Sequence, residues 1–100
     1  MTLTELIIAV KEQNLSKDQL EGYQQQMSEV YAQMQFEMAD LEKQEAIYMN
    51  KDFGERTSVA DRKVMWKATK EGQRLIVLKR YCIATKTLLN SLKSRLYSIY

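Results

Sequence analysis

The chain contains no proline, and its three glycines lie far apart, at positions 22, 54 and 72. Proline and clustered glycines are the residues that most often end a helix, so little in this sequence forces helices to be short. From residue 75 onward, apolar side chains also recur at alternating steps of three and four, the spacing of one buried helix face. The seam that they form, with one threonine in it, consists of Leu75, Leu78, Cys82, Thr85, Leu89, Leu92, Leu96 and Ile99. The sequence therefore predicts long helices that pack along this seam, either within one chain or between copies.

A capping pattern precedes each predicted helix: a Ser or Thr is followed three positions later by an acidic residue or a glutamine. The pairs are Thr2 with Glu5, Ser16 with Gln19, and Ser58 with Asp61. We predict a single helical domain over 1–100, with helices over about 3–13, 17–49 and 59–99 and a loop over 50–58. The expected fold class is all-α: a short N-terminal helix plus a long antiparallel helical hairpin with coiled-coil-like packing. Because long helices in so short a chain bury little surface alone, we expect an oligomeric bundle.

Histidine is absent and Cys82 is the single cysteine, so the usual groups for general-base catalysis, nucleophilic attack and soft-metal binding are nearly missing. The sequence predicts a protein that is not an enzyme and that has no cofactor and no metal site. No apolar run approaches the roughly 18 residues of a membrane span, and the apolar stretch at 6–10 lacks the basic region of a signal peptide. We expect no membrane association and a cytoplasmic location.

The two halves of the chain carry opposite charge. Residues 1–50 hold three lysines against nine acids, a net charge of −6, whereas residues 51–100 hold twelve cations against four acids, a net charge of +8. Such a division indicates that the halves fold against each other, that copies assemble head to tail, or that the basic half binds a polyanion.

Part of the basic charge is patterned for nucleic acid. Four cations, at positions 63, 67, 70 and 74, follow one another at spacings of four, three and four residues, which places them on one face of a helix. Arg62 and Trp66 lie beside these four cations, and the preceding loop adds three more residues. The predicted nucleic-acid-binding site therefore consists of Lys51, Phe53, Arg56, Arg62, Lys63, Trp66, Lys67, Lys70 and Arg74. Cations interleaved with aromatic rings are typical of single-stranded nucleic-acid binding. The alternative is an ordinary solvated helix face with Trp66 packed inward.

A second basic row flanks the seam, at heptad positions that usually select a helical partner. Its members are Lys79, Lys86 and Lys93 on one side and Lys67, Arg74 and Arg95 on the other. We predict that these cations are neutralised by the acidic helix, through Glu29, Glu37, Asp40, Glu42 and Glu45. Several apolar residues lie off the seam, namely Ile76, Tyr81, Ile83, Leu88, Tyr97 and Tyr100. Either the short first helix or another subunit must cover them.

The layout resembles the UvsY-like recombination mediators of large tailed phages. The similar features are an acidic helical first half, a polar loop with glycine (Asp52-Phe53-Gly54-Glu55), and a final helix ending in Leu92-Lys93-Ser94-Arg95-Leu96-Tyr97. The resemblance implies a small oligomer in the cytoplasm of a bacterial host cell. Such an oligomer binds single-stranded DNA and helps to load a RecA-type recombinase onto strands covered by single-strand-binding protein. This chain departs from the family pattern in one respect: the family has a basic cluster on the helix before the central loop, where this chain reads Leu41-Glu42-Lys43-Gln44-Glu45-Ala46-Ile47-Tyr48. We therefore expect the DNA contact of this chain at the loop and along the face from Arg62 to Arg74.

Two other functions fit the same residues. One is a small helical adaptor or inhibitor of the phage type, in which off-seam aromatic and Met side chains bind a host or assembly protein and the basic patch steers an acidic target. The other is a structural bundle protein of a virion or complex.

Overall fold

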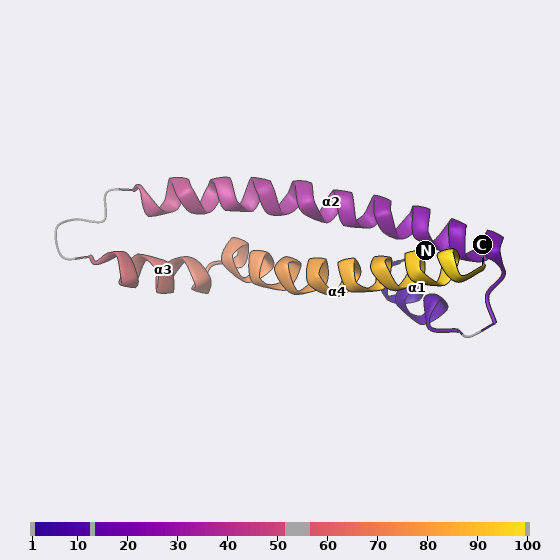
Figure 1. Ribbon diagram of the computed structural model, residues 1–100. Helices are drawn as coiled ribbons and strands as arrows, with labels where there is room; N and C mark the ends of the chain where they lie inside the picture. Colours follow the sequence, from indigo (N-terminus) through magenta and orange to yellow (C-terminus); the bar gives the residue numbers. More distant parts are fainter. Residues whose placement is uncertain (1, 13, 52–56, 100) are drawn as a thin grey trace.

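The computed structural model describes residues 2–12, 14–51 and 57–99, and of Ile99 only the backbone. Over these residues it contains four α-helices and no β-strand: α1 (Leu3–Val10), α2 (Lys17–Met49), α3 (Val59–Ala68) and α4 (Lys70–Ile99). Helix α2 lies antiparallel to α3 and α4, and α1 lies beside the end of the hairpin where α2 begins (Figure 1). The molecule measures 62 × 21 × 17 Å. The predicted all-α fold, a short first helix and a long antiparallel hairpin, is confirmed.

The helix starts follow the capping residues. The Ser16 hydroxyl accepts a hydrogen bond from the Gln19 N–H, and the Gln19 side chain accepts one from the Ser16 N–H, which completes a capping box at the start of α2. Thr2 and Ser58 cap α1 and α3 through their hydroxyls. Helix α1 ends at Val10, earlier than the predicted end near 13, and residue 13 lies outside the described residues.

The predicted helix over 59–99 is in fact two helices, because the chain breaks at Thr69. This residue has an extended backbone (φ −74°, ψ 161°), and its hydroxyl accepts from the Gly72 N–H at 3.0 Å while donating to the Trp66 carbonyl at 2.6 Å. Thr69 therefore ends α3 and caps α4. A Cβ at Gly72 would overlap the Trp66 carbonyl group, lying 2.8 Å from its carbon, so the close approach at the break requires glycine.

The core consists of two apolar clusters, one in each half of the hairpin. The first cluster, beside α1, contains Leu6, Val10, Leu20, Met27, Leu89, Leu92 and Leu96. The second, toward α3, contains Met34, Leu41, Trp66, Leu75, Leu78 and Cys82. Thr85 comes between the two groups in the α4 seam and is fully buried, and its hydroxyl has no hydrogen-bond partner among the described residues. The described side chains of the seam are thus all buried, and burial raises the pKa of the Cys82 thiol.

Helix α1 covers one side of the hairpin only. Its Leu6 and Val10 side chains are buried in the first cluster, and Leu88 of α4 packs against that cluster. The guanidinium of Arg95 donates to the carbonyl oxygens of Val10 at 2.6 Å and Glu12 at 2.8 Å, so α4 satisfies carbonyls at the end of α1. Other off-seam apolar residues stay open to solvent: Ile83 and Tyr97 are 70% and 78% exposed.

Candidate nucleic-acid interface

The predicted nucleic-acid residues that the structure describes lie along one end of the hairpin, from the end of α2 over α3 to the start of α4. Lys63 and Lys67 on α3, Lys70 at the start of α4, and Lys51 after the end of α2 are exposed. None of these four, which we call the tip lysines, forms an ion pair with a residue that the structure describes. Phe53 and Arg56, also predicted for this site, lie outside the described residues.

Arg74 is engaged within the fold. Its guanidinium donates two hydrogen bonds to the Glu37 carboxylate on α2, at 2.8 and 3.1 Å. The bidentate bond with Arg74 lowers the pKa of Glu37. This contact fulfils one of the predicted pairings between the acidic and basic helices, and it uses the charge that Arg74 would otherwise offer to a phosphate.

Arg62 also has a structural contact. From the first half of α3, its guanidinium donates to the carbonyl oxygen of Met49 at 3.1 Å. The last carbonyls of a helix lack partners within the helix and carry partial negative charge, so a cation there is favourable. Arg62 therefore joins α3 to the end of α2, and it is half-buried there.

Trp66 faces the core instead of solvent. The residue is 5% exposed, and its ring packs on Tyr48, with ring centroids 5.5 Å apart and planes tilted by 53°. The Lys51 ammonium lies 5.3 Å from the centre of the Tyr48 ring, within cation–π range. Trp66 thus takes the inward position, and it does not offer a stacking face of the kind predicted for a nucleic-acid site.

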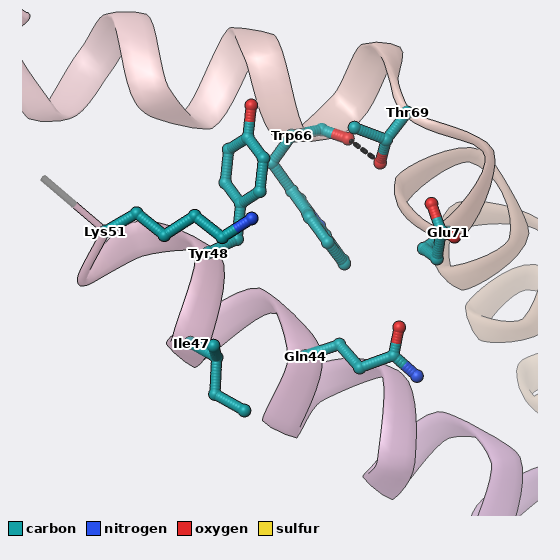
Figure 2. A pocket seen from close by; sticks show the side chains of 7 residues that line it. All are labelled: Gln44, Ile47, Tyr48, Lys51, Trp66, Thr69 and Glu71. Carbon is teal, nitrogen blue, oxygen red and sulfur yellow. Dashed lines mark hydrogen bonds between the residues drawn. The ribbon is translucent and has the colours of Figure 1, made fainter. Parts of the chain in front are cut away.

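An open groove of about 390 Å³ lies beside Trp66. Figure 2 shows it between the end of α2, which contributes Gln44 and Tyr48, and the α3–α4 junction, which contributes Thr69 and Glu71. Its rim carries an amide, a carboxylate and the Lys51 ammonium, so polar groups of both charges surround an aromatic floor.

The break at Thr69 alters the predicted basic face. Spacings of four, three and four place cations on one face only if the helix is continuous. The extended backbone of Thr69 interrupts the helix between Lys67 and Lys70, so the four cations do not share one continuous helix face. The side-chain amide of Gln73 donates to the Lys67 carbonyl across the break. Sequence reasoning missed Thr69, Gly72 and Gln73. The sequence did contain a signal for the break. Thr69 stands three positions before Gly72, the one glycine that interrupts the helical pattern of the second half.

Most of the opposite charge on the two sides of the hairpin remains unpaired. Helix α2 holds seven acids and two lysines, a net charge of −5, while α3 and α4 together hold ten cations and two acids, a net charge of +8. Between described residues, Arg74–Glu37 is the one ion pair that joins two helices. The predicted partners Lys79, Lys86 and Lys93 are exposed without a described acid in contact, and Arg95 instead binds the end of α1.

Comparisons with family models, curated proteins and solved structures find no match to this chain. Among the described residues, no three His, Cys, Asp or Glu side chains gather closely enough to hold a metal ion. The same part of the chain has no helix with the length and apolar content needed to cross a bilayer.

Proposed function

We propose that this chain binds single-stranded nucleic acid through the tip lysines. The observation that carries the proposal is that the four tip lysines are exposed and contact no described acid, beside helices α3 and α4 in which ten cations stand against two acids. Exposed lysines whose ammonium groups contact no acid bind phosphates and release counterions on binding.

The mode of binding follows from the arrangement of the tip. Because Trp66 is buried and Arg74 is paired with Glu37, phosphate contacts supply the affinity and base stacking contributes little. Binding of this kind discriminates poorly among base sequences. It also favours a flexible single strand, which can follow a short, irregular row of charges. The UvsY-like resemblance adds the biological role: an oligomeric recombination mediator that helps to load a RecA-type recombinase.

The test compares two triple variants with the same change in net charge. K63Q/K67Q/K70Q removes three tip lysines, whereas K11Q/K43Q/K93Q removes three exposed lysines elsewhere. Fluorescence anisotropy with a labelled oligonucleotide at low salt measures affinity, and circular dichroism checks that both variants keep their helices. We expect the tip variant to lose tenfold or more in affinity and the control to lose much less.

Salt dependence provides the second measurement. With four phosphate contacts, the plot of log K against log salt for the wild-type chain should have a slope of about −3. Equal losses in the two variants would mean that net charge alone, and not the tip, attracts the oligonucleotide. Absence of binding at low salt would reject the proposal.

A second candidate function has its own observation. Three apolar side chains of α3 are exposed, Val59 and Val64 by 60% and 69% and Met65 by 43%. Exposed apolar side chains on a helix suit a helical partner, as in a small adaptor or inhibitor. If the oligonucleotide does not bind at low salt, this candidate takes precedence, and V64D should then abolish binding of the partner protein.

A further inference from the structure

The α2–α4 hairpin has a groove on each of two sides, and α1 covers only one of them. On the covered side, Ile7 of α1 lines a hollow together with Val30 of α2 and Tyr81 of α4. A hollow of about 330 Å³ that includes Tyr31 and Ile83 is lined by residues of α2 and α4 alone. Neighbouring residues of a helix point about 100° apart, and residues two apart about 200°, so the two hollows open on different sides. The second groove is not covered by any part of the chain that the structure describes.

The uncovered groove extends along the hairpin. Another hollow in it, of about 230 Å³, includes Gln24 and Lys93, each seven residues from a residue that lines the 330 Å³ hollow. Residues seven apart share one face of a helix, so these two hollows lie in line. Three positions of each helix repeat at this spacing and define what we call the lysine groove: Gln24, Tyr31 and Met38 on α2, and Lys79, Lys86 and Lys93 on α4.

The lysine groove is basic. The α2 residues that line its larger hollow are uncharged, namely Tyr31, Gln35 and Met38. In the smaller hollow, Glu21 lines the wall together with Lys93, and the Glu21 carboxylate pairs with Lys17 at 3.9 Å. All three groove lysines are exposed, and no acid within residues 2–12, 14–51 and 57–99 forms an ion pair with any of them. Their charge is therefore available to a binding partner.

Apolar side chains lie beside the groove lysines. Cys82 is buried and Met38 is half-buried in the larger hollow, and Ile83, which is 70% exposed, belongs to its α4 wall. A row of cations beside a recessed apolar strip is complementary to a helix that carries acids beside an apolar stripe. The covered side shows that this hairpin accepts an amphipathic helix, because Leu6 and Val10 of α1 are buried there against α2 and α4.

We propose that the lysine groove binds an acidic amphipathic helix of a partner protein. The apolar stripe of that helix packs on Met38, Cys82 and Ile83, and its carboxylates, spaced seven residues apart, meet the three groove lysines. Lys79 and Lys93 are fourteen residues apart, about 21 Å along α4, so a partner helix of about four turns reaches all three. A nucleic-acid strand would be attracted to the same lysines, but the aliphatic strip favours a helix, since nucleobases stack on aromatic rings.

The first test uses a synthetic peptide as the probe. It is a fluorescein-labelled peptide of three heptads, with leucine at the a and d positions and glutamate at the e and g positions. One control peptide has the same composition in a permuted order that gives no apolar stripe, and another has lysine in place of glutamate. Fluorescence anisotropy at low salt measures the affinity of each peptide for the full chain. We expect the acidic amphipathic peptide to bind about tenfold more tightly than either control, or better.

Two variants of the chain locate the binding. K79Q/K86Q/K93Q removes the groove lysines and I83D places a carboxylate in the groove wall, so each should weaken peptide binding by about tenfold or more. The matched controls are K63Q/K67Q/K70Q, with the same change in net charge, and I8D, at a similarly exposed isoleucine of α1. Both controls should bind the peptide as the wild type does, and circular dichroism checks that all four variants keep their helices. Absence of peptide binding at low salt, equal binding of the permuted peptide, or unchanged affinity in either groove variant would overturn the proposal.

Oligonucleotide binding by the same variants separates this proposal from the one for the tip lysines. K79Q/K86Q/K93Q should lose the peptide and keep most of its affinity for the labelled oligonucleotide, and K63Q/K67Q/K70Q should do the reverse. Loss of the oligonucleotide with retention of the peptide in K79Q/K86Q/K93Q would identify the lysine groove as a nucleic-acid surface and would overturn the proposal. Each of the two proposals thus fails on its own probe.

Discussion

At the scale of single residues, the core contains one polar exception. Thr85 occupies a seam position among leucines, is fully buried, and has no described partner for its hydroxyl. A buried hydroxyl without a hydrogen bond costs free energy, because it loses its contacts with water and gains none in return. Along α4, Thr85 lies between Cys82 of the second apolar cluster and Leu89 of the first.

T85V should therefore stabilise the protein. Valine has nearly the shape of threonine, so the substitution removes the unpaired hydroxyl without opening a cavity, and we expect a gain of about 1 kcal/mol. Thermal unfolding followed by circular dichroism, at one fixed protein concentration, measures the change. T85A is the matched control, because it removes the hydroxyl together with a methyl group and should destabilise. A lower unfolding temperature for T85V would show that the hydroxyl has a favourable contact in solution.

At the scale of the elements, the division between α3 and α4 depends on Gly72. The Thr69 cap brings the start of α4 so close to the Trp66 carbonyl that no side chain fits at Gly72. Gly22, by contrast, lies in α2 at a position where an added Cβ would meet no atom within 4 Å. Two glycines in helices of one chain thus have opposite roles.

This contrast predicts opposite effects of the same substitution. G72A should lower the free energy of unfolding by about 1–3 kcal/mol, since backbone atoms must shift to admit the Cβ. G22A should raise it by about 0.5–1 kcal/mol, because alanine is the better helix former. Chemical denaturation at one protein concentration measures both. If G72A proved as stable as G22A, the break would not be the favoured state of the chain.

The elements also show what sequence reasoning can and cannot predict. Capping residues and apolar periodicity were sufficient for α2 and for the seam of α4, because both signals are local. The break was missed because the apolar spacing on either side of it gives no sign of a discontinuity. For the candidate site, the exposure of the tip lysines follows from local pattern. The engagement of Arg62, Trp66 and Arg74 does not, because it depends on α2 residues distant in sequence, namely Met49, Tyr48 and Glu37.

At the scale of the whole molecule, the hairpin is polarised across its width. Helix α2 carries −5 and the opposite side carries +8, with one described ion pair between helices. The remaining attraction acts over several ångströms through solvent, and its range is limited by the Debye length, about 10 Å at 0.1 M salt. Apart from the Arg74–Glu37 pair, the acidic and basic sides thus attract each other without a described ion pair between them.

The unfolding temperature should therefore fall when salt is raised from low to moderate concentration, because screening weakens this attraction. The scan is made by circular dichroism with chloride salts at one protein concentration. E29K/D40K reduces the negative charge of α2 and should show a smaller decrease. An unfolding temperature that is independent of salt would mean that attraction across the hairpin contributes little.

The burial of Trp66 has a practical consequence. It is the only tryptophan of the chain, and it lies where α2, α3 and α4 meet, at one end of a molecule 62 Å long. Its fluorescence is thus an intrinsic optical reporter of this one junction. Emission that moves to longer wavelength while the far-ultraviolet dichroism stays constant identifies local opening of the junction, distinct from unfolding of the molecule as a whole.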